Sequence, residues 1–385
     1  MEATLRHRYP PEVFPDLMPV APGPIEVQVS HSVDPDAWNR MVAAHPFGRF
    51  EDTTLRHQAF CRCHPDTRRF YLTARIGERE VGYLGFCETF FGHDILTWKK
   101  AWRPLIFPFA YAMSSFDAFT APLIFAEQRE ADITKAFLET LDRLAKDRHI
   151  YLLTHLRYPS PGHQPALGPE YFAQRDFRCL AHGTYLIDLR QDLDALWAGL
   201  KQEARTAVRK ARKQGIEVRL GEGEEDFARY YELFAENRLR DQHKGMLRPV
   251  YSAESMVDHV RFFASRDALK LFCAHIDGQL GSATLVKYYN GIVSFNCHAR
   301  GDEWHGRNLH DGDLLVWEMI RWAREQGFRY FDMTGFDVVP ANERQRGIQR
   351  FKSKWGGECV YYNYYSKVYG RARDRAVSLA RKALR

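Results

Sequence analysis

Carboxylates, glycines and a lysine beside aromatic residues gather in one short stretch near the C-terminal end of this 385-residue chain. The stretch reads Tyr330-Phe331-Asp332-Met333-Thr334-Gly335, passes Asp337, and resumes as Gly347-Ile348-Gln349-Arg350-Phe351-Lys352-Ser353-Lys354-Trp355. A lysine ammonium can hold a phosphate or stabilise an oxyanion, and a carboxylate can accept a proton or orient an amine.

Lys352 is therefore the candidate that stabilises a developing oxyanion, and Asp332 or Asp337 is the candidate that accepts a proton. Five further residues are candidates for holding the phosphates and carbonyls of the substrates: Arg240, Arg248, Asn342, Arg350 and Trp355. Each candidate also has a structural alternative, since a strand-end carboxylate often bonds to nearby backbone N–H groups and most charged side chains are solvated.

An amphipathic helix and an apolar strand must position these groups. Leu315, Met319 and Trp322 recur at helical spacing, and a strand over 328–333 follows them. The first half of the chain repeats this arrangement with a helix and then a strand over 150–156. The apolar positions of that first helix are Ile133, Phe137, Leu141 and Leu144. The repeat predicts two α/β units of one design.

A predicted β-hairpin precedes the helix in both halves. The first hairpin pairs 70–76 with 81–86 around a turn at Gly77, and the second pairs 271–276 with 280–286 around a turn at Gly278. The join between the two units is expected near Gly183.

A basic helix is predicted over about 195–214, capped by Asp192 or Asp194 and stopped by Gly215. Its apolar stripe is narrow, and its second stripe consists of cations at helical spacing: Lys201, Arg205, Arg209 and Arg212. Charge runs are usually solvated helix faces. The functional alternative is a track for phosphates or RNA backbone, in which Arg205 and Arg209 bind substrate.

The composition predicts a globular protein of about two domains, because 45% of the residues are hydrophobic and 14% are aromatic. The net charge of +6 suits an anionic ligand, RNA or an anionic membrane surface. Seven scattered cysteines favour a reducing compartment. The Pro-rich start predicts an extended arm over 1–27 and no signal peptide, and prolines break the apolar stretch 105–125, so no spanning helix is expected there.

Several motifs resemble the FemAB-type aminoacyltransferases. The basic segment matches through Arg205, Arg209-Lys210-Ala211 and Lys213-Gln214-Gly215, and the opening stretch matches through Phe331-Asp332, Gly335, Gly347-Ile348 and Phe351-Lys352. A third match is Leu315-Val316-Trp317-Glu318-Met319-Ile320 with Gly327. The resemblance covers most of the chain, from about 35 to 370.

This resemblance implies two tandem GNAT-like acyltransferase domains, an α/β fold with mixed sheets. It implies transfer of an aminoacyl group from aminoacyl-tRNA to an amine of a peptidoglycan precursor, with Lys352 at the position of the lysine that stabilises the charged intermediate. Relatives of the same fold use acyl-CoA. The chain departs from the family in lacking a long helical hairpin and in lacking, before Leu314, the Gly-rich turn that cradles a diphosphate.

We therefore expect an arm over 1–27, a first domain over 28–182, a second, catalytic domain over 183–370 and a basic tail over 371–385. The expected function is N-acylation of a phosphate-bearing cell-envelope precursor by a cytoplasmic protein, with peripheral contact at the inner membrane face. The donor is aminoacyl-tRNA or acyl-CoA, and no bound cofactor or metal is expected. Two alternatives stay open: an acyl-CoA-dependent N-acetyltransferase acting on a small amine, and a non-catalytic RNA- or membrane-binding module on a GNAT-like fold.

Overall fold

The computed structural model of the chain describes residues 22–63, 67–90, 114–161, 163–243 and 253–372, together with 375 and 379. The chain forms two compact units. The first contains Met1–Ala181 and also Tyr361–Arg385, and the second contains His182–Val360. The expected second domain over 183–370 therefore ends too late, because the chain returns to the first unit at Tyr361.

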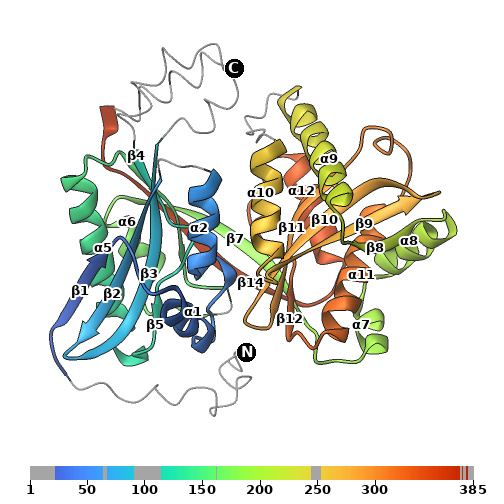
Figure 1. Cartoon of the computed structure of the whole chain (residues 1–385). Helices are drawn as coiled ribbons and strands as arrows, with labels where there is room; N and C mark the ends of the chain where they lie inside the picture. Colours follow the sequence, from blue (N-terminus) through green and yellow to red (C-terminus); the bar gives the residue numbers. More distant parts are fainter. Residues whose placement is uncertain are drawn as a thin grey trace. The chain divides into compact units, whose positions relative to one another are not determined.

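The sheet of the first unit runs in the order β1-β2-β3-β4-β6-β14 (Figure 1). Its strands are β1 (Ile25–Ser30), β2 (Arg68–Ile76), β3 (Arg79–Phe90), β4 (Ser114–Asp117), β6 (Leu152–Tyr158) and β14 (Glu358–Val368), and the short β5 (Leu123–Ile124) pairs with β3. Its helices are α1 (Pro35–Ala44), α2 (Thr54–Cys63), α5 (Glu130–Asp147) and α6 (Pro169–Ala173). Because β1 pairs with β2 from Ile25 onward, the predicted arm over 1–27 is too long at its C-terminal end.

The sheet of the second unit runs in the order β7-β12-β11-β10-β9-β8. Its strands are β7 (Phe177–Asp188), β8 (Glu217–Gly221), β9 (Leu269–Ile276), β10 (Gln279–Tyr289), β11 (Ile292–Arg300) and β12 (Tyr330–Asp332), and the short β13 (Phe336–Asp337) pairs with β7. Its helices are α7 (Leu193–Gly199), α8 (Gln202–Lys213), α9 (Glu224–His243), α10 (Ala253–Ala264), α11 (Asp311–Glu325) and α12 (Glu343–Ser353).

Both units contain the predicted hairpin, helix and strand. The hairpins are β2–β3 and β9–β10, and in each unit the strand after the long helix lies parallel to its neighbour, as β4–β6 and as β11–β12. Most of the apolar residues at the predicted helix positions are buried, including Phe137 of α5 and Met319 of α11, while Leu144 and Trp322 are partly buried. The mixed α/β fold is confirmed.

The two parallel pairs differ where the strands end. β11 and β12 pair only from Ile292 with Tyr330 to Ser294 with Asp332, after which the Met333 N–H donates to Tyr185 O over 3.0 Å. The sheet of the second unit therefore separates beside Asp332, and splayed strands of this kind leave room for a substrate.

In the first unit, β4 and β6 stay joined beyond their paired residues. The Ala118 N–H donates to Thr154 O over 3.1 Å, and the Arg157 N–H donates to Thr120 O over 2.9 Å. The sheet of the first unit is therefore closed at the place where that of the second unit is open.

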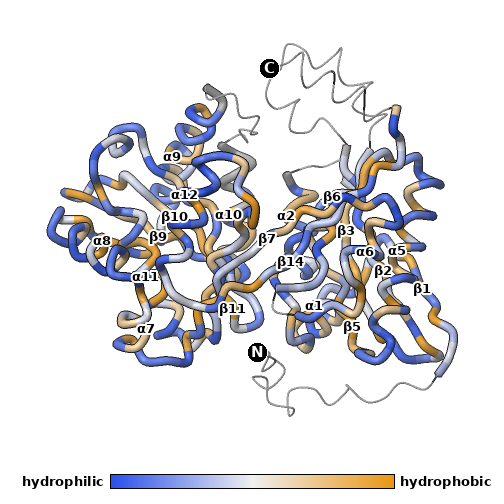
Figure 2. Tube along the Cα trace, turned by 180° about the vertical axis from the view of Figure 1, so that it is seen from behind, coloured by the Kyte–Doolittle hydropathy of each residue, from blue (hydrophilic) through white to orange (hydrophobic). Residues whose placement is uncertain are grey.

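The predicted basic helix is broken into α7 and α8. Leu200 adopts an extended conformation, and the Lys201 N–H donates to Lys354 O over 3.0 Å instead of continuing the helix. Figure 2 shows α8 largely in hydrophilic colours, interrupted by the apolar residues of its buried face. Gly215 has a φ of +73°, which suits its predicted role at the helix end.

Candidate functional site

Lys352 lies in the last turn of α12, where its side chain is directed inward and is only 7% exposed. Its ammonium donates to Gly335 O over 2.7 Å, to Thr334 O over 3.1 Å and to the Thr334 hydroxyl over 3.3 Å. An ammonium has three N–H donors, so the 334–335 turn accounts for all of them. Lys352 thus lies at a helix end and holds the turn that follows β12.

Burial lowers the pKa of the Lys352 ammonium to about 8, although the negative charges of Asp332 and Asp337 act in the opposite direction. A lysine in this range is still mostly protonated at neutral pH, but it loses its proton far more readily than a surface lysine. Lysines with lowered pKa values occur mainly at functional sites, because keeping a poorly solvated charge costs stability.

Asp332 ends β12 and is also buried, with 4% of its surface exposed. Its Oδ1 accepts the Thr184 hydroxyl over 2.6 Å and the Thr334 N–H over 2.7 Å. Thr334 has a φ of +58°, an uncommon value for a residue with a side chain. The two bonds fix the carboxylate next to the strained turn that Lys352 holds.

Asp337 lies in β13, opposite His182 of β7. The His182 Nε2 and the Asp337 Oδ1 are 3.6 Å apart, and both side chains are only partly exposed. The structure thus brings three predicted catalytic residues, Lys352, Asp332 and Asp337, into one charge cluster at the splayed end of β12.

Three other predicted residues of this region have structural surroundings. Asn342 is the N-cap of α12, and its Oδ1 accepts the Gln345 N–H over 3.0 Å. The side chain of Arg350 is 75% exposed and lies 3.8 Å from Glu343. Trp355 is 1% exposed within the core of the second unit.

The predicted arginines also bond to the protein itself. Arg205 donates to Ala198 O over 2.9 Å and to Leu200 O over 2.6 Å, so it caps the end of α7. The guanidinium of Arg209 lies 5.5 Å from the ring centre of Trp197. Arg240 of α9 donates to Arg300 O over 2.6 Å and pairs with Asp302. Arg248 lies outside the described residues.

Sequence reasoning missed Thr184 and His182, which lie on β7. No local signal marks them, because Thr184 is 148 residues from its partner Asp332. Thr334 lies within the stretch from Tyr330 to Gly335, and its position between a carboxylate and a glycine could have marked it as a site residue.

The first turn of α11 carries two carboxylates at the place where a Gly-rich turn would hold a diphosphate. Asp311 is 1% exposed and lies 3.1 Å from Arg300, and Asp313 is 9% exposed and forms an ion pair with Lys354. His310 provides no side-chain cap. Phosphates favour helix N-termini lined by glycine N–H groups. In this turn each carboxylate is paired with a cation, so the two pairs carry no net charge.

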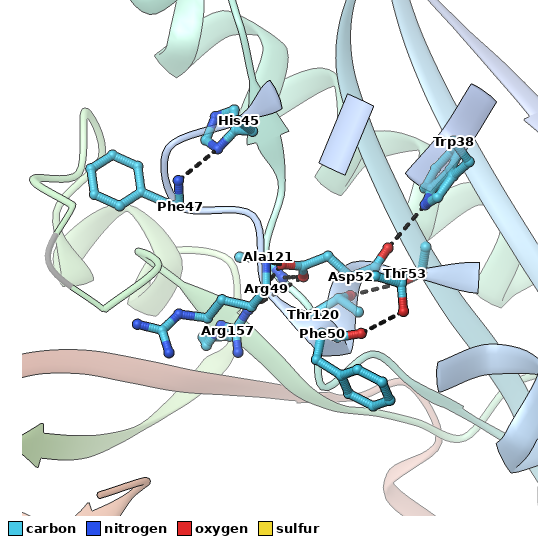
Figure 3. Close-up of polar contacts among 11 residues, drawn as sticks. Trp38, His45, Phe47, Arg49, Phe50, Asp52, Thr53, Thr120, Ala121 and Arg157 are labelled. Atoms are coloured by element: carbon cyan, nitrogen blue, oxygen red, sulfur yellow. Dashed lines mark hydrogen bonds and ion pairs between the residues drawn. The ribbon is translucent and has the colours of Figure 1, made fainter. Parts of the chain in front are cut away.

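The first unit has a buried ion pair at the equivalent strand end (Figure 3). Arg157, in β6, lies with its Nη2 3.3 Å from Asp52 Oδ1. The carboxylate also accepts the Arg49 N–H over 2.9 Å and the Ala121 N–H over 3.2 Å. Burial raises the pKa of the Asp52 carboxyl, against the effect of the Arg157 charge. This ion pair anchors a loop rather than repeating the lysine cluster.

Among the described residues, no group of three or more His, Cys, Asp or Glu side chains is arranged to hold a metal ion. Within the same part of the chain, every helix is too short or too polar to cross a bilayer. Part of the apolar stretch 105–125 lies outside the residues that the structure describes. The strands β4 and β5, which are described, are mostly buried.

A protein-family model described as an acetyltransferase (GNAT) domain matches residues 198–353. A search of curated proteins found no significant match. Among solved structures, FemX aligns with a TM-score of 0.58 at 12% identity, covering 88% of this chain and 96% of that one. A tandem GNAT protein from the clavulanic acid biosynthesis pathway aligns with a TM-score of 0.54 at 18% identity, covering 90% and 99%. A protein of unknown function from Bacteroides thetaiotaomicron aligns at 0.51 and 12% identity, covering 89% and 100%.

Proposed function

We propose that this chain transfers an aminoacyl or acyl group to an amine of a cell-envelope precursor, because residues 198–353 match the family model of a GNAT acetyltransferase domain. The observation that carries the proposal is the buried Lys352, whose pKa is lowered to about 8 and which lies beside Asp332 at the splayed end of β12. A desolvated cation next to a fixed carboxylate suits a reaction in which negative charge develops on an acyl oxygen.

In the proposed reaction, the lone pair of the amine nitrogen attacks the acyl carbonyl carbon, and the carbonyl electrons move to its oxygen. Lys352 stabilises that oxyanion by exchanging its longest hydrogen bond, the one of 3.3 Å to the Thr334 hydroxyl, for a bond to the substrate oxygen. The oxyanion then collapses and expels the oxygen or sulfur of the donor, while a carboxylate of the cluster accepts the proton of the amine.

Asp332 is better suited to orient the amine than to accept its proton, since its Oδ1 already accepts two hydrogen bonds. Asp337 is more exposed and lies beside His182, so it is the better candidate proton acceptor. The His182 ring passes that proton to solvent, and the departing oxygen or sulfur takes up one proton from solvent, so that protons balance.

The proposal extends to the chemical classes of the donor and the acceptor. The stretch before Leu314 lacks the closely spaced glycines of a diphosphate cradle, which supports an ester donor such as aminoacyl-tRNA over a CoA thioester. The likeness to FemX supports the fold alone. The Phe351-Lys352 segment resembles the FemAB-type aminoacyltransferases, and this resemblance supports a peptidoglycan-type acceptor amine. A cytoplasmic location at the inner membrane face follows from such an acceptor.

The proposal is tested with purified protein and a panel of donors and envelope precursors, following transfer of a radiolabelled acyl group. Lys352→Ala should abolish transfer with its fold intact by circular dichroism, and Arg346→Ala on the same helix should leave the rate unchanged. An undiminished rate in Lys352→Ala would remove the proposed role. Transfer from acetyl-CoA to small amines alone would instead identify the N-acetyltransferase alternative, which the family description favours.

A further inference from the structure

We propose that Cys61 is an oxidation site for peroxides and that Cys87 converts the oxidised sulfur into a disulfide. The disulfide joins α2 of the first unit to β3 of its sheet, and its formation does not depend on acyl transfer. Three features support it: the close packing of α2 on β3, the contact between the two thiols, and the cations beside Cys61.

A glycine lets α2 pack directly on β3 (Figure 1). The His57 ring of α2 covers Gly85, where a Cβ would lie only 2.3 Å from His57 Cε1. Cys61 follows His57 by four residues and therefore lies on the same side of the helix. Cys87 follows Gly85 by two residues and therefore lies on the same face of the strand. Four helix residues and two strand residues both span about 6 Å, so the two cysteines face each other.

The two thiols are in direct contact, since the Cys87 thiol donates a hydrogen bond to the Cys61 sulfur. Cys87 is completely buried. Cys61 is only partly buried, and its Sγ lies 3.9 Å from Thr67 O, directly before β2. A disulfide requires two adjacent sulfurs, and this contact provides them. Solvent therefore reaches Cys61, and an oxidised Cys61 sulfur has a second thiol beside it.

The two thiols differ in how readily they lose a proton. The hydrogen bond from Cys87 lowers the pKa of the Cys61 thiol to about 7, supported by the charges of Arg69 and Arg56 and opposed by burial. The same bond, together with burial, raises the pKa of the Cys87 thiol. Because Arg69 pairs with Cys87 across β2 and β3, its side chain lies on the same face of the sheet. Cys61 is therefore partly a thiolate at neutral pH, which is the form that reacts with peroxides.

The oxidation has two steps. The Cys61 thiolate attacks one oxygen of hydrogen peroxide and the O–O bond breaks, so the sulfur becomes a sulfenic acid and the hydroxide that leaves takes up a proton to give water. The Cys87 sulfur then attacks the sulfenic sulfur, the S–O bond breaks, and the hydroxyl leaves as water with the Cys87 proton. One peroxide is thus reduced while two thiols are oxidised to one disulfide. In the reducing compartment that the cysteine pattern predicts, such a bond is transient.

The test exposes the full-length protein to a small excess of hydrogen peroxide at neutral pH, blocks the remaining thiols by alkylation and digests the product with trypsin. Trypsin cleaves after Arg62 and so separates Cys61 from Cys63. Mass spectrometry should find the peptide that contains Cys61 joined to the peptide 80–99, which contains Cys87, and dithiothreitol should separate the two. A bond from Cys61 to any other cysteine, or its oxidation to sulfinic acid without a bond, would overturn the proposal.

Cys87→Ala removes the second thiol, so the sulfenic acid of Cys61 should persist and its labelling by dimedone should increase about tenfold over the wild type. The matched control, Cys273→Ala, removes another completely buried strand thiol and should form the disulfide as the wild type does. Cys61→Ser should abolish both the bond and the label, and circular dichroism checks that all three variants fold. Equal labelling of the wild type and Cys87→Ala would show that Cys87 does not react with Cys61.

The pH dependence of oxidation distinguishes this pair from an ordinary exposed thiol. The rate at Cys61 should reach half its maximum near pH 7, the pKa of that thiol. Burial raises the pKa of the Cys179 thiol above its usual value of 9.0, so the rate at this exposed cysteine should still increase above pH 9. If Cys179 is oxidised as fast as Cys61 at pH 7, the thiol pair has no special reactivity and the oxidation site is wrong.

Discussion

The Thr184 hydroxyl donates to Asp332 Oδ1 over 2.6 Å and so joins β7, the first strand of the second unit, to the strand that ends at the lysine cluster. Both residues are almost completely buried. The orientation of a carboxylate at the centre of the site therefore depends on a residue whose importance only the folded chain reveals.

Replacing Thr184 with Val keeps the shape of the side chain but removes this donor. We expect a loss of about 1–3 kcal/mol in the free energy of unfolding, because a buried carboxylate loses a partner. Transfer should also slow about tenfold or more through misplacement of Asp332. Chemical denaturation and initial rates measure the two effects, and Thr184→Ser, which restores a hydroxyl, should recover most of both.

The charge of Lys352 predicts how the transfer rate varies with pH. If the ammonium stabilises the oxyanion, the rate should fall as pH rises through about 8, the pKa to which burial lowers this group. Lys352→Arg keeps its charge at high pH, so any residual activity of that variant should lack the fall. A wild-type rate that keeps increasing above pH 9 would argue that the neutral lysine acts instead.

The same group predicts a pH dependence of stability. The pKa of Lys352 is about 8 in the folded chain and 10.5 as a free side chain, so between these values the unfolded chain binds more protons. Stability should therefore rise with pH across that window, by on the order of 3 kcal/mol. The free energy of unfolding of the wild type minus that of Lys352→Met isolates this effect. A flat difference from pH 8 to 10.5 would contradict it.

The Asp52–Arg157 pair predicts a purely structural effect in the first unit (Figure 3). Arg157→Met leaves a buried carboxylate without its cation and should destabilise the chain by about 3–5 kcal/mol. Adding Asp52→Asn removes that charge, so the double variant should lose less than the sum of the single changes. Additive losses in thermal unfolding would show that the two side chains act independently.

Arg205 is predicted to stabilise the end of α7. Arg205→Lys keeps the positive charge but cannot reach both carbonyls at the end of α7, so we expect a loss of about 1–2 kcal/mol. Chemical denaturation measures this loss. An unchanged free energy of unfolding would mean that the two hydrogen bonds do not stabilise the end of α7.

The sequence predicted the elements that depend on local patterns. Apolar runs around Gly77 and Gly278 marked both hairpins, and the spacing of Leu315, Met319 and Trp322 marked α11. The lysine and the carboxylates were found because they lie in one short motif.

The features that the sequence did not predict depend on tertiary contacts. Within α12, Lys352 is buried and Arg350 is exposed, because residues two apart point to different sides of a helix and the sequence did not show which side faced inward. The break between α7 and α8 follows from the hydrogen bond of Lys201 to Lys354 O, a partner 153 positions along the chain. No pattern within a helix-length window contains that information.

Because β14 belongs to the first unit, truncating the chain before it would affect the two units differently. Because β14 pairs with β6 over Asn363 to Val368, the second unit is continuous in sequence while the first is assembled from both ends of the chain. A fragment ending at Ala181 would expose one edge of β6, a ready template for aggregation. During synthesis the first unit cannot complete its sheet until β14, which follows the second unit in the chain, has left the ribosome.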